Sequence, residues 1–316
     1  MLAISTAWLA RSERPLEEML ALLAGQGFRE LELNFVVHPL DIERMQRLCG
    51  RLGLHVVSLH NICSALTEPV APDDQYGDNL ASLSEEERRQ SVMHLRSTAE
   101  AALRLGARAV VVHSGSVASL KGENAYFEML RAFAAGAADA GHVRAEMRRR
   151  MAARQTLGRP HVEQLLRSLS EVCADFPQLQ FGLECRYHYY SLPSLDELGY
   201  VLDRLGLPNV GYWHDCGHAQ VQENLGLCRH VDWLERYGDY LIGFHLHGLG
   251  DPVHDHYAPA PGNMPFEMIR DYMREDTLRV LELNPGNSLE SVLAGRDYLQ
   301  ALFAGQPAPQ MEQAIP

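Results

Sequence analysis

The sequence predicts an α/β fold, a (β/α)8 TIM barrel with a helical insertion after the fourth strand. Eight short β-rich runs alternate with helical patterns along the chain, as in barrels of this kind. The length of 316 residues suits one such barrel. A doubly wound open sheet is the alternative, but it normally carries a glycine-rich phosphate turn after its first strand, and "STAWLARS" has none.

The predicted strands follow from local patterns of apolar residues. They cover residues 2–8, 28–35, 54–61, 107–115, 179–185, 209–218, 240–248 and 278–286. The first helical pattern begins near Pro15 and ends at Gly25 and Gly27, residues that favour helix starts and stops. Residues 28–35 alternate apolar and polar side chains, which is typical of a strand.

The domain organisation that we expect is a single barrel over residues 1–303. Two connections are unusually long, and both leave the C-terminal end of a strand, where barrel active sites are built. Residues 61–83 contain an irregular loop, and residues 115–159 are expected to form an inserted helical lid. The last residues, 304–316, are expected to form a flexible tail.

Composition narrows the class of protein. An apolar fraction of 46% is enough for a full core, and no apolar run approaches a membrane span of ~20 residues. The N-terminus lacks a secretory pattern, and the six cysteines are scattered without a CxxC pair, so we expect a cytoplasmic protein. The net charge of −13 argues against a nucleic-acid partner, despite a basic stretch at 144–154. A homo-oligomer is compatible with this composition.

Polar side chains end six successive predicted strands. Because the C-terminal ends of barrel strands meet at one rim, we expect these groups to lie together. Burying so many charges without partners would cost several kcal/mol each, which bound metal cations would offset. Mixed imidazole and carboxylate donors suit zinc first, and also manganese, iron or cobalt. The predicted ligands, enough for two to three divalent ions, are His60, His113, Glu184, Asp215, His218, His245, His247, His254, His256 and Glu282.

Five residues near this rim are candidates for contact with a substrate. Arg186, Tyr187 and His188 follow the fifth strand, whereas Trp8 and Asn34 end the first two. Simple packing or a hydrogen-bonded rim role is the alternative for each of them. His245 and His247 lie on the same face of the seventh strand, and the sequence leaves open which of the two binds metal.

In this order, the residues resemble the xylose isomerase-like TIM barrel superfamily (AP endonuclease family 2), and its endonuclease IV branch most closely. That branch holds three zinc ions through His, His, Glu, Asp-x-x-His, His, Asp-x-His and Glu. The corresponding motifs here are "DCGH" at 215–218, "FHLH" at 244–247, "HDH" at 254–256 and "LELNPG" at 281–286. The departure is His254, which stands where the branch has aspartate, so the ligand role could pass to Asp255.

The resemblance implies a multi-metal hydrolase that cleaves a phosphodiester of a small or cofactor-like substrate by attack of metal-bound hydroxide. Glu184, Asp215 and Glu282 would be its catalytic carboxylates, and a cobamide-remodelling phosphodiesterase is one candidate. The alternative is a single-metal sugar or sugar-phosphate isomerase or epimerase, with two carboxylates moving protons. His60, His113 and the HDH motif exceed that smaller set and favour the hydrolase. An abasic-site DNA endonuclease and an inactive metal-binding barrel are less favoured.

Overall fold

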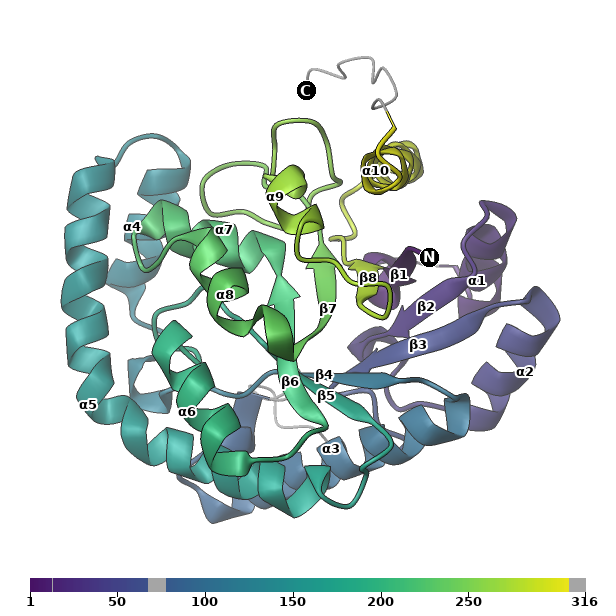
Figure 1. The fold of residues 1–316 in the computed structure, drawn as a ribbon, viewed down its shortest axis with the longest axis horizontal. Coiled ribbons are helices and arrows are strands. Elements are labelled where there is room, and N and C mark those ends of the chain that lie inside the picture. The colour runs from purple at the N-terminus through teal and green to yellow at the C-terminus, as the bar shows by residue number, and fades with distance from the viewer. Residues whose placement is uncertain (13, 68–77, 307–316) are drawn as a thin grey trace.

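The computed structural model describes residues 1–12, 14–67 and 78–306, and its eight strands close into a parallel barrel in the order of the sequence (Figure 1). The predicted fold is therefore confirmed. The strands are β1 (Ala3–Ser5), β2 (Glu30–Leu33), β3 (His55–His60), β4 (Ala109–Val112), β5 (Gln180–Glu184), β6 (Val210–Asp215), β7 (Leu241–Leu246) and β8 (Leu278–Leu281).

Helices surround the barrel and connect its strands. They are α1 (Leu16–Gly25), α2 (Ile42–Leu52), α3 (Glu85–Leu105), α4 (Asn124–Ala134), α5 (Ala140–Cys173), α6 (Leu195–Leu205), α7 (Cys216–Leu225), α8 (His230–Tyr237), α9 (Phe266–Arg270) and α10 (Leu289–Phe303). Local chemistry sets their ends. At the start of α2, the Asp41 side chain accepts a hydrogen bond from the Arg44 N–H, and Gly53 ends the helix in the left-handed region.

The barrel interior is filled by side chains and is not a pore. Val57, Val111 and Val280 pack around Trp213, which is fully buried beneath the rim. Space for this indole depends on Gly243, because a Cβ there would lie 2.5 Å from the Trp213 ring. A larger apolar layer lies between the strands and the helices, as expected for this architecture.

Several strands are shorter than the sequence pattern predicts. β4 stops at Val112 and β8 at Leu281, so His113 and Glu282 lie just beyond their strands. β6 passes directly into α7, because the Asp215 Oδ1 accepts a hydrogen bond of 2.7 Å from the His218 N–H and caps the helix. His218 therefore lies in the first turn of a helix, where its position is rigid.

The segment 115–159 contains α4 and the first part of α5. α5 continues without a break past residue 159 and through Pro160 to Cys173, and in Figure 1 it runs along one edge of the molecule. Tyr126 and Met147 of this segment share an apolar cluster with Tyr190 and Val221. Its role as a lid stays a prediction. Parts of two other predicted segments, residues 68–77 and 307–316, lie outside the described residues.

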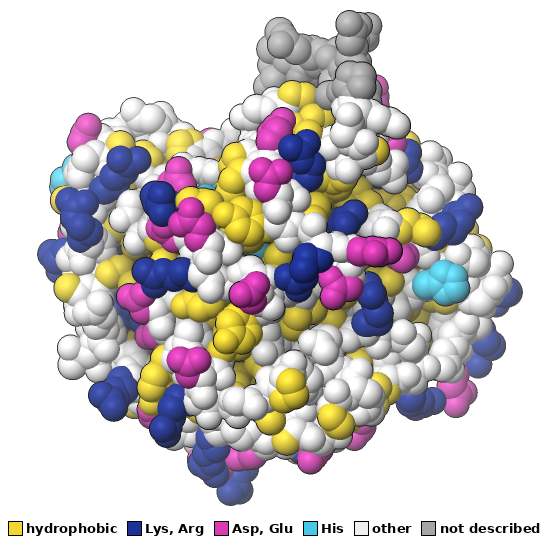
Figure 2. Space-filling view, in the orientation of Figure 1, with side chains coloured by type: hydrophobic (Ala, Val, Ile, Leu, Met, Phe, Trp, Pro, Cys, Tyr) yellow, Lys and Arg dark blue, Asp and Glu magenta, His cyan; other side chains and the backbone are white. Residues whose placement is uncertain are grey.

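On the face seen in Figure 2, acidic and basic side chains are interspersed, with hydrophobic side chains between them. No helix among the described residues is both long and apolar enough to cross a lipid bilayer. The six cysteines are all free.

Candidate metal centre

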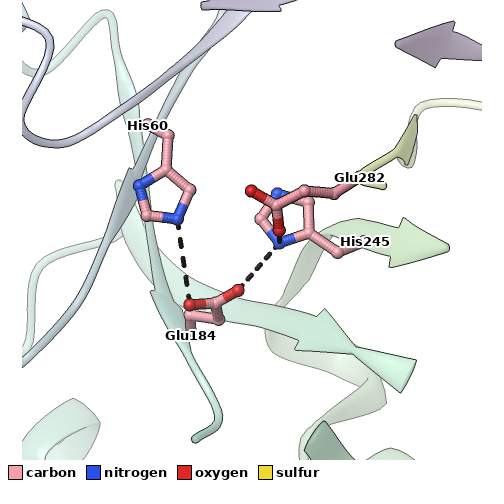
Figure 3. A group of neighbouring side chains, drawn as sticks. All are labelled: His60, Glu184, His245 and Glu282. Carbon is pink, nitrogen blue, oxygen red and sulfur yellow. Dashed lines mark hydrogen bonds and ion pairs between the residues drawn. The ribbon is translucent and has the colours of Figure 1, made fainter. Parts of the chain in front are cut away.

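Three carboxylates converge on one imidazole nitrogen at the C-terminal end of the barrel. His245 Nδ1 lies 2.8 Å from Glu184 Oε1, 3.0 Å from Glu282 Oε2 and 3.6 Å from Asp215 Oδ2. Strand register contributes to this, because Asp215 on β6 pairs directly with His245 on β7. All four side chains are buried, and Figure 3 shows Glu184 and Glu282 both directed toward His245.

The other nitrogen of His245, Nε2, contacts a fourth carboxylate. Its Nε2 lies 3.1 Å from Glu32 Oε1, and a carboxylate can only accept, so Nε2 carries the hydrogen. In a neutral ring the Nδ1 lone pair would then face three carboxylates, and either a proton on Nδ1 or a bound metal cation stabilises this arrangement. Burial alone would lower the pKa of His245, but Glu282 and Glu32 raise it well above its ordinary value. These donors fit a divalent metal ion.

Glu32 belongs to this site, although it is not among the predicted metal ligands. The Ser58 hydroxyl donates to Glu32 Oε2 at 2.8 Å, so the carboxylate is held from both sides. Metal-bound histidines commonly direct their second nitrogen to such a carboxylate. The available signal was the alternation of residues 28–35, which places Glu32 on the same strand face as Asn34.

His247 acts on Asp215 and does not present a lone pair to a metal. Its Nδ1 accepts a hydrogen bond of 2.9 Å from the His256 N–H, so the hydrogen of the neutral ring is on Nε2. That Nε2–H lies 3.0 Å from both oxygens of Asp215. These contacts favour His245 as the strand-7 ligand, while Asp215, His247 and His256 form another group of donors close enough together to hold an ion.

Three further histidines have the opposite arrangement, with Nδ1–H directed to a backbone carbonyl. The acceptors are Asn61 O at 3.0 Å for His60, Cys185 O at 2.9 Å for His218 and Glu282 O at 3.1 Å for His256. Each Nε2 is left with its lone pair available, which is the usual tautomer of a metal ligand. His60 Nε2 lies 3.9 Å from Glu184 Oε2, at the edge of the first cluster (Figure 3).

A second corner is formed by His218, His256 and Asp255. Asp255 Oδ2 lies 3.4 Å from His218 Nε2, and Asp255 Oδ1 lies 3.9 Å from His256 Nε2. The backbone of His256 has a φ of 60°, which a residue other than glycine rarely adopts. Burial lowers the pKa of His256, but Asp255, Glu282 and Asp215 outweigh it and raise that pKa to about 9.

His254, a predicted ligand, lies outside the cluster around His245 and outside the corner of His218, His256 and Asp255. Its side chain is 58% exposed, and its Nδ1 lies 2.6 Å from Asp251 Oδ2. The same aspartate accepts the His254 N–H through Oδ1, so this local turn directs the imidazole toward solvent. Asp255, and not His254, lies with His218 and His256.

His113, the remaining predicted ligand, contacts Glu184 and an arginine. His113 Nε2 lies 2.7 Å from Glu184 Oε2 and 2.6 Å from Arg186 Nη1. Burial would raise the pKa of Glu184, but His113 and His245 lower it well below its ordinary value. Burial opposes ionisation of Asp215 as well, and there His218 and His247 lower the pKa. Both carboxyl groups are therefore ionised, as metal ligands must be.

A cavity of about 380 Å³ opens above the cluster. Its walls include Asn34, Arg186 and Tyr187, three of the predicted substrate contacts. Asn34 also donates to Glu282 Oε1 at 3.2 Å. The other two predicted contacts lie elsewhere: Trp8 packs in the core, and His188 lines a neighbouring cavity of about 610 Å³.

Comparisons with known proteins agree with this architecture. A family model described as "Xylose isomerase-like TIM barrel" matches residues 20–301. No curated protein matches the sequence significantly. A D-tagatose 3-epimerase-like protein is 18% identical with a TM-score of 0.64, and the match covers 96% of this chain and 97% of that one.

Two further structures share the fold. D-psicose 3-epimerase from Clostridium cellulolyticum H10 is 13% identical with a TM-score of 0.66, covering 96% of this chain and 99% of that one. An AP endonuclease, family 2, from Brucella melitensis is 17% identical with a TM-score of 0.61, covering 93% of this chain and 96% of that one.

The prediction of a phosphodiesterase was wrong. Structures described as sugar epimerases predominate among the similar folds, and they favour the alternative of a sugar isomerase or epimerase. The number of rim histidines was the reason for preferring the hydrolase. In the structure His247 holds Asp215 and His254 faces solvent, whereas His113 contacts an arginine.

Proposed function

The chain belongs to the xylose isomerase-like TIM barrel family, and on that premise we propose that it is a metal-dependent epimerase of a small keto sugar. One divalent cation would be held by Glu184, Asp215, His245 and Glu282. The observation that carries the proposal is the approach of three carboxylates to His245 Nδ1, at 2.8, 3.0 and 3.6 Å. Zinc, manganese, iron and cobalt all suit this mixed donor set.

When bound, such a cation would polarise the carbonyl oxygen of a substrate and so make the neighbouring C–H more acidic. The chain's own carboxylates would then move the proton. Glu184 comes from β5 and Glu282 from the end of β8, so the two approach the centre from different sides of the barrel. One carboxylate would take the proton from the carbon and the other would return one to the opposite face. Substrate and product would therefore contain the same atoms and differ only in the configuration at that carbon.

The cavity supports a substrate of this size. Its volume of about 380 Å³ is in the range of small-molecule sites and suits a monosaccharide. Asn34 and Arg186 offer hydrogen-bond donors to hydroxyl and carbonyl oxygens, and Tyr187 supplies an aromatic wall. Asn34 would also position Glu282, to which it already donates.

The test is hydrogen exchange from solvent. The protein is stripped of metal, reloaded with Mn²⁺, Co²⁺ or Zn²⁺, and incubated in D₂O with ketohexoses, ketopentoses and 3-keto glycosides. Nuclear magnetic resonance should show deuterium at the carbon beside the carbonyl and the appearance of the epimer. Folded, metal-loaded protein that exchanges no hydrogen of any keto sugar would contradict the proposal.

Variants separate the roles of the carboxylates. Glu184→Gln and Glu282→Gln should each slow the exchange by about 10²–10⁴-fold, the usual effect of losing a general acid or base. The matched control is Glu290→Gln, which changes an exposed glutamate on α10 and should leave the exchange rate unaltered.

A further inference from the structure

Arg186 lies at the corner of the rim where His113 and Glu184 meet. It follows β5 by two residues, and its Nη1 lies 2.6 Å from His113 Nε2 and 3.4 Å from Glu184 Oε2. His113 and Glu184 are 3% and 0% exposed, so both side chains are buried. Both residues are among the predicted metal ligands.

The direction of the hydrogen bonds at this corner follows from the donors available. A guanidinium only donates, so Arg186 donates to His113 Nε2 when that nitrogen carries its lone pair. The same nitrogen lies 2.7 Å from Glu184 Oε2 and so contacts both the guanidinium and the carboxylate. Two electron-rich atoms in such close contact need a positive charge beside them, and Arg186 supplies it.

A metal ion in this corner would need the same lone pair. A zinc–nitrogen bond is about 2.0–2.1 Å long, so the ion would collide with an Nη1 that lies 2.6 Å from that nitrogen. The guanidinium keeps its charge at every pH at which the protein is folded. It therefore supplies a positive charge at this corner that does not depend on pH.

We propose that Arg186 is a built-in cation that replaces a divalent ion at the corner of His60, His113 and Glu184. The protein then binds one ion fewer than its rim histidines predict, and removing the arginine side chain creates a metal site. His60 is ready to join that site, because its Nε2 lone pair lies 3.9 Å from Glu184 Oε2. The inference rests on the metal centre of the proposed function, but it concerns ion number and not reaction type.

The experiment counts metal ions per chain. Four proteins are compared: wild type, Arg186→Ala, Arg186→Lys and the double variant Arg186→Ala/His113→Ala. Each is stripped of metal with a chelator, reloaded with Zn²⁺ or Mn²⁺ and desalted. Bound metal is then measured by inductively coupled plasma mass spectrometry. Arg186→Ala should bind one ion more than wild type. Arg186→Lys should match wild type, since it keeps a cation at the corner, and the double variant should lose the additional ion.

A spectroscopic measurement gives a second readout. Two neighbouring Mn²⁺ ions couple magnetically, so electron paramagnetic resonance of Mn²⁺-loaded Arg186→Ala should show a coupled pair that the double variant lacks. Circular dichroism checks that each variant is folded, and Arg186→Met takes the place of the alanine variant if that one does not fold.

Two results would overturn the proposal. Equal ion counts in folded wild type and Arg186→Ala, including zero in both, would show that the arginine excludes no metal. An additional ion that persists in the double variant would lie at another site. These measurements contain no substrate, so their outcome is independent of the proposed function. If the protein exchanges hydrogen but wild type and Arg186→Ala bind equal numbers of ions, only this inference is overturned. If the ion counts differ but no hydrogen is exchanged, only the proposed epimerase function is overturned.

Discussion

His245 Nε2 lies 3.1 Å from Glu32 Oε1, and on the opposite side of the ring Nδ1 faces Glu184, Glu282 and Asp215. The two partners lie 213 residues apart in the chain, on β2 and β7. A carboxylate behind the ring fixes its tautomer and increases the basicity of the nitrogen that faces the site.

Replacing Glu32 should weaken metal binding without unfolding the barrel. In Glu32→Gln the negative charge behind His245 is lost, so we expect the affinity for Mn²⁺ or Zn²⁺ to fall about 10- to 100-fold. Isothermal titration calorimetry measures the affinity. The matched control is Glu30→Gln, which changes a partly exposed glutamate on the same strand. Equal affinities for the two variants would show that Glu32 has no influence on the ion.

The two histidines of β7 and its following loop should behave differently. His245→Ala removes a ligand, so the ion nearest Glu184 should be lost. His247→Gln removes only the contact that holds Asp215, and affinity should fall by about 10- to 100-fold with the ion still bound at high concentration. Metal content after equilibrium dialysis distinguishes the two. A larger loss in His247→Gln than in His245→Ala would reverse the assignment of the ligand.

Gly217 should be irreplaceable, because His247 packs directly against it. A Cβ at position 217 would lie 2.1 Å from His247 Cε1, and that ring cannot move without losing Asp215. We expect Gly217→Ala to lower the free energy of unfolding by about 1–3 kcal/mol and to weaken metal binding. Denaturant titration measures the first effect.

The control for that variant is Gly50→Ala. Gly50 lies within α2 at an exposed position, and nothing lies within 4 Å of its added Cβ. Alanine should raise the free energy of unfolding there by about 0.5–1 kcal/mol. If both alanine variants changed stability in the same direction, the close approach at Gly217 would not be the cause.

Stability should depend on pH through a buried histidine pair outside the metal centre. His230 Nε2 lies 2.9 Å from His214 Nε2, and burial lowers the pKa of His230 from 6.5 to about 3. Below pH 6.5 the unfolded chain therefore binds a proton that the folded protein refuses, so acid favours unfolding. This stabilisation is complete above pH 6.5 and is lost progressively as the pH falls toward 3.

The measurement is urea unfolding of metal-free protein at pH 7, 6 and 5. In His230→Gln the slope of unfolding free energy against pH should be shallower than in wild type, by up to about 1.4 kcal/mol per pH unit. His142→Gln, at an exposed position on α5, is the control and should keep the wild-type slope. A slope in His230→Gln that equals that of wild type would contradict the assignment.

The barrel and the rim could both be predicted from local patterns. Alternating strands and helices identify the fold because each element must bury one apolar face, and that requirement is visible in a short window of sequence. His60, Glu184, Asp215 and Glu282 were found for a related reason. A polar group that ends an apolar strand is conspicuous, and all parallel strands of a barrel end at the same rim.

Only the tertiary structure distinguishes the contacts of the individual rim residues. The sequence left open whether His245 or His247 is the ligand and whether Asp255 takes the place of His254, and it gave no sign that Arg186 contacts His113. The hydrogen bonds and the side-chain clusters of the folded barrel distinguish these alternatives. Each depends on distances between groups that lie up to 213 residues apart in the chain. The sequence determines which donors reach the rim, whereas the direction of each proton and the position of each charge are fixed only when the closed barrel brings its first and last strands together.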